Sequence, residues 1–355
     1  MKKIAVLTSG GDSPGMNAAL RAITKVSAAR GVQVFGSLEG YEGLIDGRFR
    51  ELTHVHGGEV LPDPELDFLG GTGGTVLGSA RSARFREEEG RVKAARSLEG
   101  FDGLVVIGGN GSLTGAHILA QEHGIRVMGL PASIDNDIGC SGTAIGVDTA
   151  LNTIVEACDR ISDTARAHRR AFVVEVMGRQ CGYLAMASGV AVGADAVLFR
   201  EDGRSEAQLV GAVAELIRTS FAKRSKRRVL IIKAEGVEMP CTRLVRQTEE
   251  LLPGVEIRAT VLGHVVRGGN PSFQDRMVSS RMGLAAVDAL LNGETDQMVG
   301  WQPPIPGGVP TGDPMTFRFP LEQVLRETES LIDGSSPVTK RRVHMMQKVQ
   351  GVLSL

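Results

Sequence analysis

Short runs of apolar residues alternate along the chain with stretches in which apolar residues recur at helical spacing. The apolar runs cover residues 4–7, 104–107, 127–130, 171–176 and 229–232. Helical periodicity appears at residues 16–29 and 113–122, soon after the first two runs. Continuous apolar strands that alternate with helices are typical of parallel sheets covered by helices on both faces. The pattern therefore predicts an α/β fold.

A Gly- or Ser-rich turn follows each of the first three runs, at residues 9–11, 108–111 and 131–133. Open α/β sheets bind ligands outside the carboxyl ends of their strands. We therefore expect the chemistry of this protein in these turns.

Length and composition narrow the class of protein. A chain of 355 residues predicts two domains, and its formal net charge of −1 gives no general attraction to nucleic acid or to an anionic membrane. The apolar run after Lys2 and Lys3 is too short for a secretory signal. The four cysteines, which are Cys140, Cys158, Cys181 and Cys241, show no metal-ligand spacing. We expect a cytoplasmic protein with reduced thiols.

The turn at residues 9–17 has the sequence SGGDSPGMN. Gly10 and Gly15 have the spacing of a phosphate-binding P-loop, but Met16 and Asn17 stand where that loop needs Lys and Ser or Thr. The dinucleotide fingerprint G-x-G-x-x-G is absent as well. The turn either presents backbone N–H groups to a phosphate or is a tight turn without a ligand.

Two further sets of residues could take part in catalysis or in ligand binding. Asp135 and Asp137 lie two residues apart in a loop, so that one can bind Mg²⁺ while the other accepts a proton, although an Asx turn gives the same pattern. Arginines beside glycine suit bidentate phosphate contacts, although each is also an ordinary surface residue type. The cationic set is Arg81, Arg170, Arg179, Arg258, His264 and Arg267.

Taken together and in this order, these motifs resemble the phosphofructokinase family, which phosphorylates fructose 6-phosphate at its 1-hydroxyl. The similar segments run from Lys3 to about Gly293 and include residues 8–12, 77–81, 133–137, 174–179 and 258–264. The resemblance implies two three-layer α/β/α Rossmann-like domains with the active site in the cleft between them, usually in a homotetramer. Residues 1–146 plus about 266–316 would form the larger, ATP-binding domain. Residues 147–265 plus about 317–355 would form the smaller, sugar-phosphate-binding domain.

The resemblance also implies roles for individual residues. Asp135 would accept the proton of the sugar hydroxyl, and Arg179 with the backbone N–H of Gly11 would stabilise the transferring phosphoryl group. The ATP site would comprise Gly11, Tyr41, Arg81, Ser82, Gly109, Asn110, Gly111 and Ser112. The fructose 6-phosphate site would comprise Ser133, Asp135, Asp137, Arg170, Met177, Gly178, Arg179, Glu235, Arg258, His264 and Arg267. Arg170 and Arg258 would reach the 6-phosphate from a neighbouring subunit.

Asn110 is the main departure from the family pattern, which has an aspartate that helps to hold the Mg²⁺ of Mg-ATP. Asn110 and Asp137 are the expected metal ligands here, with one negative charge fewer than usual. Because Mg²⁺ is commonly held by one or two carboxylates plus phosphates and water, Asp137 could suffice at reduced affinity. Alternatively, the chain is a non-catalytic or weakly active ligand-binding member.

The phosphoryl donor and the regulation are further open points. Pyrophosphate-dependent relatives carry larger charged residues at Gly111 and Ala132, so the small residues here favour ATP over pyrophosphate. Ser82 replaces an aromatic residue found near the adenine in some relatives. A candidate effector site comprises Arg21, Lys25, Asp195, Arg224, Lys226 and Arg227. His54 replaces an arginine expected in that site, and the basic run at residues 223–228 also fits a solvated turn.

Overall fold

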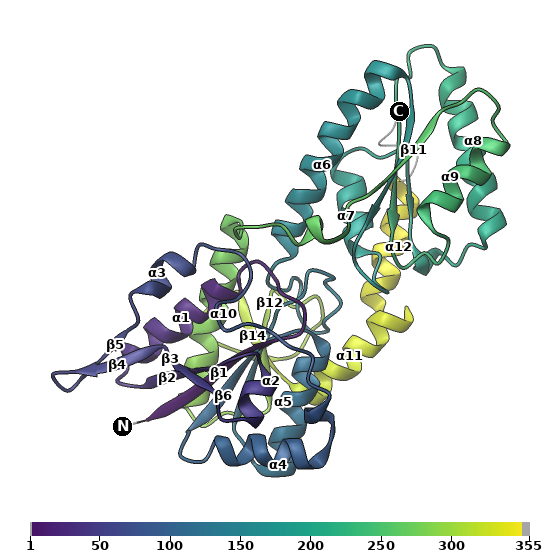
Figure 1. Cartoon of the computed structure of the whole chain (residues 1–355). Helices are drawn as coiled ribbons and strands as arrows, with labels where there is room; N and C mark the ends of the chain where they lie inside the picture. The colour runs from purple at the N-terminus through teal and green to yellow at the C-terminus, as the bar shows by residue number, and fades with distance from the viewer. Residues whose placement is uncertain (1, 350–355) are drawn as a thin grey trace. The chain divides into compact units, whose positions relative to one another are not determined.

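The chain forms two compact α/β units, which the computed structural model describes over residues 2–349 (Figure 1). The first unit comprises the described residues up to Thr149 together with Arg267–Glu329. The second comprises Ala150–Val266 together with the described residues from Ser330 onward. The predicted α/β class is confirmed. Residues 317–329 lie in the first unit and not, as expected, in the second, because β14 (Thr316–Pro320) belongs to the sheet of the first unit.

An eight-stranded sheet forms the centre of the first unit. Its other strands are β1 (Lys3–Ser9), β2 (Gln33–Ser37), β3 (Phe49–Glu51), β6 (Gly103–Gly108), β7 (Val127–Pro131), β12 (Gln297–Trp301) and β13 (Val309–Pro310). Their order is β13-β14-β12-β7-β6-β1-β2-β3, and the strands from β12 to β2 run parallel. The antiparallel strands β3, β14 and β13 lie at the two edges. The predicted strands at residues 4–7, 104–107 and 127–130 are thus confirmed as the central strands.

Helices cover this sheet, as the apolar runs predict. They are α1 (Met16–Ala28), α2 (Tyr41–Ile45), α3 (Glu65–Leu69), α4 (Glu88–Ser97), α5 (Asn110–His123) and α10 (Phe273–Leu291), with a 3-10 turn η1 (Arg84–Arg86). Alternate residues of β1 and β6, such as Ile4 and Val105, pack against Leu20 of α1 and Met282 of α10 in one buried cluster. After β3, the strands β4 (Thr53–His56) and β5 (Glu59–Pro62) form an antiparallel hairpin that is separate from the eight-stranded sheet.

The second unit is built on a four-stranded parallel sheet. Its strands are β8 (Ala171–Val176), β9 (Ala196–Leu198), β10 (Val229–Ala234) and β11 (Ile257–Val261), in the order β11-β8-β10-β9. Its helices are α7 (Tyr183–Ala191), α8 (Glu206–Ala222), α9 (Cys241–Glu250) and α12 (Pro337–Val349), with a 3-10 turn η2 (Arg200–Asp202). Val173 and Ile231 pack under α8 and α9, so this unit has its own core.

Three elements span a unit boundary: α6 (Val147–His168), η3 (Gly263–Arg267) and α11 (Leu321–Asp333). The Pro- and Gly-rich stretch at residues 303–313 lies within the first unit, where it contains β13. Over residues 2–349, no helix combines the length and the apolar character needed to cross a membrane.

Candidate active site

The candidate site begins where the strand order of the first sheet reverses direction. β1 lies between β2, which follows it in sequence, and β6, which comes much later. In open α/β sheets, ligands bind at such a switch point, outside the carboxyl ends of the strands. The turns after β1 and β6 border that point, and both are the Gly-rich turns predicted from the sequence.

Close backbone approach explains the glycines in these turns. A Cβ atom on Gly108 would lie 2.5 Å from the carbonyl oxygen of Ser9 and 2.6 Å from Ser112 Oγ. Gly10 and Gly15 have φ angles of 92° and 112°, which L side chains rarely adopt. Glycine is therefore required at these three positions for the turns to adopt this conformation.

The segment that carries Arg81 lies against the first turn. Ser79 Oγ donates a hydrogen bond to the carbonyl oxygen of Gly10 at 2.5 Å. Thr8 Oγ1, at the end of β1, donates to the carbonyl oxygen of Gly78 at 2.9 Å. Exposed Arg81, one of the predicted nucleotide residues, follows two residues after Ser79, which contacts the Gly-rich turn.

The side chain of Arg267 contacts the turn after β1. Its Nη1 donates to the carbonyl oxygen of Asp12 at 2.7 Å. A Cβ atom on Gly11 would come within 2.8 Å of this Nη1. The structure therefore brings Gly11 and Arg267, predicted for different substrates, into direct proximity within the first unit.

Tyr41 contacts the first turn of α5. The side chain is buried, its ring stacks on Phe85 with centroids 4.0 Å apart, and its hydroxyl donates to the carbonyl oxygen of Ser112 at 2.7 Å. Burial raises the pKa of the Tyr41 hydroxyl, so it remains a donor at neutral pH. The sequence placed Tyr41 in the nucleotide pocket, and the structure shows it beneath the backbone of that region.

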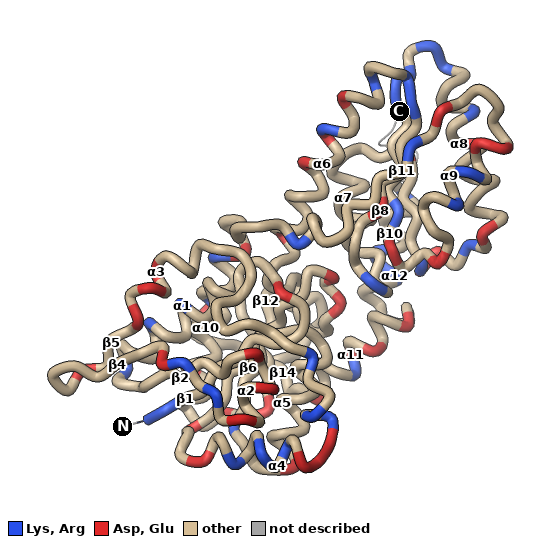
Figure 2. Tube along the Cα trace, in the orientation of Figure 1, with Lys and Arg blue, Asp and Glu red and all other residues tan. Residues whose placement is uncertain are grey.

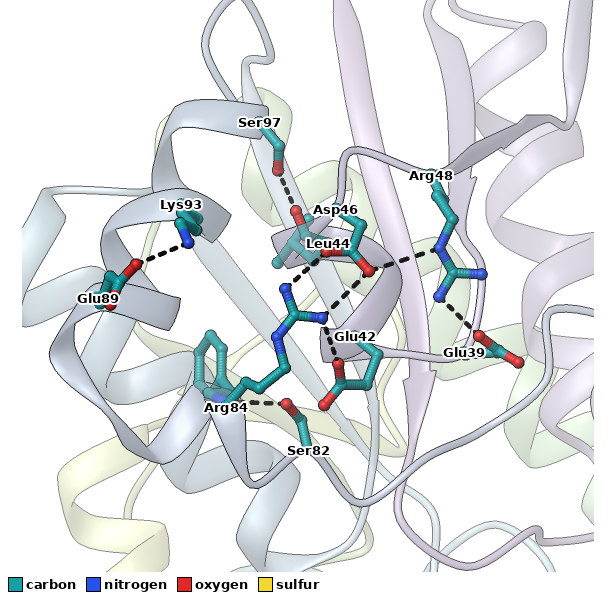
Figure 3. A network of polar contacts seen from close by, with 11 residues as sticks. Glu39, Glu42, Leu44, Asp46, Arg48, Ser82, Arg84, Glu89, Lys93 and Ser97 are labelled. Carbon is teal, nitrogen blue, oxygen red and sulfur yellow. Dashed lines mark hydrogen bonds and ion pairs between the residues drawn. The ribbon is translucent and has the colours of Figure 1, made fainter.

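A network of ion pairs fixes the turn that contains Ser82 (Figure 3). Ser82 Oγ accepts a hydrogen bond from the N–H of Phe85, a residue of η1, at 3.0 Å. Arg84 donates to Glu42 at 2.9 Å and to Asp46 at 2.7 Å, tying η1 to α2. The Arg84 guanidinium lowers the pKa of the Asp46 carboxyl. Ser82 is therefore held by a hydrogen bond within its own turn.

The loop after β7 carries both predicted carboxylates. Ser133 Oγ accepts from the N–H of Asp135 at 3.3 Å and donates to Asp137 Oδ1 at 3.2 Å. Asn136 has a φ angle of 51°, and its amide bonds the backbone of residues 142 and 144. Asp135 is 4% exposed and Asp137 is half-buried. The loop therefore orders the backbone that carries both carboxylates, and Ser133 also holds the carboxylate of Asp137.

This loop lies beside the turn after β6, because the N–H of Ala132 donates to the carbonyl oxygen of Gly108 at 2.9 Å. Asn110 is the first residue of α5, at the end of that turn. Among residues 2–349, no cluster of three His, Cys, Asp or Glu side chains could hold a metal alone. Asn110 and Asp137 offer an amide oxygen and a carboxylate, which are donor types that suit Mg²⁺ when phosphates and water supply its other ligands.

In the second unit, Glu235 holds the turn after β8. Its Oε1 accepts from the N–H groups of Gly178 at 3.1 Å and Arg179 at 2.6 Å. These residues have φ angles of 140° and 48°, and a left-handed arginine is retained only where the surroundings enforce it. Met177 is buried before this turn, and exposed His264 follows the neighbouring strand β11.

Arg170 and Arg258 lie at the opposite end of the same sheet. Arg170 directly precedes β8, Arg258 is the second residue of β11, and both form ion pairs with Glu256. Since β8 spans six residues, its two ends are roughly 20 Å apart. Within one chain, the structure therefore does not bring these arginines to Arg179 and Glu235.

Three of the six candidate effector residues, Lys25, Asp195 and Lys226, form ion pairs in the structure. Lys25 pairs with Asp67, and Lys226 pairs with buried Asp195 at 2.7 Å. Asp195 Oδ2 also accepts from the N–H of Leu230 at 2.8 Å. In the second unit, exposed Arg224 and Arg227 belong to the cationic turn between α8 and β10 (Figure 2), whereas Arg21 and Lys25 lie on α1 of the first unit.

The sequence analysis did not identify the residues that hold the predicted site residues in place. Ser79 and Glu256 are ordinary polar residues in the sequence, and only the fold shows that they hold Gly10 and the arginine pair. Lys233 could have been singled out from the sequence, because it is a charged residue near the end of a buried apolar strand.

Comparisons with known proteins agree with this geometry. The phosphofructokinase family model matches residues 3–290. Curated relatives named ATP-dependent 6-phosphofructokinase are 48% identical in Thermotoga petrophila, over 85% of this chain and 90% of the relative, and 45% identical in Thermotoga neapolitana, over 94% and 100%.

A solved structure of phosphofructokinase from Saccharomyces cerevisiae superposes with a TM-score of 0.80 at 34% identity. That alignment covers 100% of this chain but only 48% of the yeast chain, so the present chain spans about half the yeast protein's length. The family match covers residues 3–290, which is most of the chain. The chain therefore belongs to the phosphofructokinase family.

Proposed function

We propose that the protein is a glycolytic kinase, which transfers the γ-phosphoryl group of ATP to the 1-hydroxyl of fructose 6-phosphate. The products are fructose 1,6-bisphosphate and ADP. The observation that carries this proposal is the 45–48% identity, over at least 85% of this chain, to relatives named for that activity. The geometry of both units supports it.

The first unit would bind the nucleotide. The phosphates would lie against Gly11, Gly109, Gly111 and Ser112, at the switch point and at the start of α5, where the helix dipole favours anions. A Cβ atom on Gly111 would meet nothing within 4 Å, so there is space beside α5 for a nucleotide α-phosphate. Arg81 would contact the nucleotide, while Tyr41 and Ser82 would support the surrounding backbone.

Asp135 would accept the proton of the sugar hydroxyl. The ordered backbone of its loop supports this role, because proton transfer requires a base within hydrogen-bond reach. The transition state of phosphoryl transfer is loose, so positioning and charge stabilisation by Arg179 and the N–H of Gly11 would supply more of the rate.

Mg²⁺ would be the metal, held by Asp137, Asn110 and the phosphates. When bound, it neutralises charge on the phosphoryl oxygens. This chain contributes one carboxylate and one amide oxygen, so its own ligands carry less charge than the family pattern provides.

The second unit would bind fructose 6-phosphate through Glu235, Met177, Gly178, Arg179 and His264, with Ser133 and Arg267 from the first unit. Arg170 and Arg258 would serve the 6-phosphate of a neighbouring subunit, since they lie at the far end of β8 from Arg179. We therefore propose a homo-oligomer, with a homotetramer as the expected state. The four free cysteines agree with a cytoplasmic location.

A coupled assay with fructose 6-phosphate tests this function. Wild-type protein is given Mg-ATP or Mg-pyrophosphate, and product is measured by cleavage of fructose 1,6-bisphosphate linked to NADH oxidation. We expect turnover with ATP and none above background with pyrophosphate. Turnover only with pyrophosphate would replace the donor, and no turnover with either would favour a non-catalytic binding protein.

A further inference from the structure

A lysine lies buried in the central region of the second unit. Lys233 is the fifth residue of β10 and is 1% exposed. It faces the same side of the sheet as Ile231, which belongs to the apolar core. A buried ammonium is costly unless it is paired and hydrogen-bonded.

The Lys233 ammonium has three acceptors. Its Nζ lies 3.0 Å from Glu175 Oε2, 3.2 Å from the carbonyl oxygen of Ala234 and 3.0 Å from that of Val237. Glu175 is its direct neighbour in the register of β8 and β10. Three donors thus meet three acceptors, which satisfies the group.

Two of these acceptors lie on either side of Glu235 in the sequence. The turn from residue 234 to 237 carries Glu235 and Gly236, and Lys233 holds it at both ends. The carboxylate of Glu235 in turn accepts from the N–H groups of Gly178 and Arg179. Contacts therefore run from Lys233 to the turn, from the turn to Glu235, and from Glu235 to the left-handed Arg179.

The two turns also approach closely. A Cβ atom on Gly236 would lie 2.2 Å from the carbonyl oxygen of Arg179. A shift of the 234–237 turn would therefore move the backbone of Arg179 directly. Stability alone does not account for the lysine, since apolar replacements of buried ion pairs are often neutral or stabilising.

We propose that Lys233 is a positioning residue for the sugar-phosphate site. It fixes the 234–237 turn, and through Glu235 it keeps Gly178 and Arg179 in the conformation that binds substrate. This inference rests on the proposed function for the substrate, but the contacts themselves involve the second unit alone. Lys233 does not touch the substrate.

The test compares Lys233→Met with Ile231→Ala. Methionine keeps most of the side-chain length and removes the ammonium, whereas Ile231→Ala disturbs the same strand face two residues away. We expect Lys233→Met to raise KM for fructose 6-phosphate on the order of ten- to a hundredfold, with KM for ATP within about twofold. Ile231→Ala should lower Tm but leave both KM values within about twofold.

A second measurement does not depend on activity. Hydrogen exchange of the Gly178 and Arg179 amides in ligand-free protein should accelerate about tenfold or more in Lys233→Met, and stay near wild type in Ile231→Ala. If the wild type lacks activity, the proposed function fails while exchange still tests the positioning role. If Lys233→Met does not fold, Glu175→Gln replaces it in the test. The proposal then requires that Glu175→Gln also accelerate exchange of the Gly178 and Arg179 amides, by a smaller factor. Unchanged exchange and an unchanged KM for fructose 6-phosphate would overturn the proposal.

Discussion

Replacing Asn110 with aspartate should change both the metal requirement and the stability. Asn110 is the first residue of α5, it is half-buried, and the first turn of this fully described helix carries no acidic residue. An added carboxylate would face the positive end of the helix dipole, which contributes about 0.3–1 kcal/mol. We therefore expect Asn110→Asp to raise Tm by about 1–4 °C, given the size of the first unit.

The same charge would act on Mg²⁺. An amide offers a dipole where a carboxylate offers a full charge, and a tenfold gain in apparent affinity needs only about 1.4 kcal/mol. We expect Asn110→Asp to reach half-maximal activity at about one tenth of the free Mg²⁺ that the wild type needs. Activity is titrated against free Mg²⁺ at fixed ATP, and Tm is measured without nucleotide.

Asn292→Asp is the matched control, because Asn292 is an exposed residue at a helix C-terminus, directly after the last residue of α10. There a negative charge faces the negative end of the dipole, so Tm should fall slightly and the Mg²⁺ curve should not move. Identical Mg²⁺ curves for wild type and Asn110→Asp would refute the metal role of Asn110. An inert wild type with an active Asn110→Asp variant would instead support a non-catalytic natural protein.

Three further outcomes follow from the structure. Asp135→Ser should lower kcat on the order of 10²–10⁴-fold with little change in fructose 6-phosphate binding, and a near-wild-type kcat would remove it as the base. Arg170→Ala should raise KM for fructose 6-phosphate, and hybrids of Arg170→Ala and Asp135→Ser chains should regain activity; verified hybrids that stay inactive would contradict a shared site. Burial raises the pKa of the Cys140 and Cys158 thiols from 9.0 to about 12, so the folded state keeps protons that the unfolded state releases. Urea midpoints should therefore be unaffected by these thiols below about pH 9 and fall as pH rises toward 12, and the double Cys→Ala variant should lose part of that fall.

The central strands could be predicted from sequence because their burial is nearly complete. In β6 every residue is buried, so residues 104–107 form an uninterrupted apolar run. The edge elements gave weaker patterns. In β4 only Thr53 is buried, and β13 has two exposed residues, so neither strand produces an apolar run.

The sequence predicted a unit boundary near residue 316, whereas the boundary in the structure follows Glu329. In the sequence, the Pro- and Gly-rich stretch at residues 303–313 separates the body of the chain from a C-terminal part rich in Lys and Arg. In the structure, β14 follows this stretch and pairs with β12 in the sheet of the first unit. Antiparallel pairing across a connection of this kind depends on contacts that a local pattern does not contain.

For the candidate site, residues with unusual chemistry in turns were identifiable, but their supports were not. Asp135 and Gly11 lie in conspicuous motifs, whereas Glu256 is one acidic residue among many until the fold places both arginines beside it. Tyr41 matched a family position, and only the structure shows that its hydroxyl holds the carbonyl of Ser112. Long-range contacts of this type follow from three-dimensional packing and leave no spacing in the sequence.

The most direct test of the central claim is to follow the phosphoryl group itself. Wild-type protein is incubated with Mg-ATP labelled in the γ-phosphate and with fructose 6-phosphate, and the product is identified by phosphorus NMR and by the position of the label. The structure predicts a new phosphate ester at the 1-hydroxyl, formed by the wild type and nearly lost in Asp135→Ser. Label released only as inorganic phosphate, or an ester at another hydroxyl, would contradict the proposed reaction.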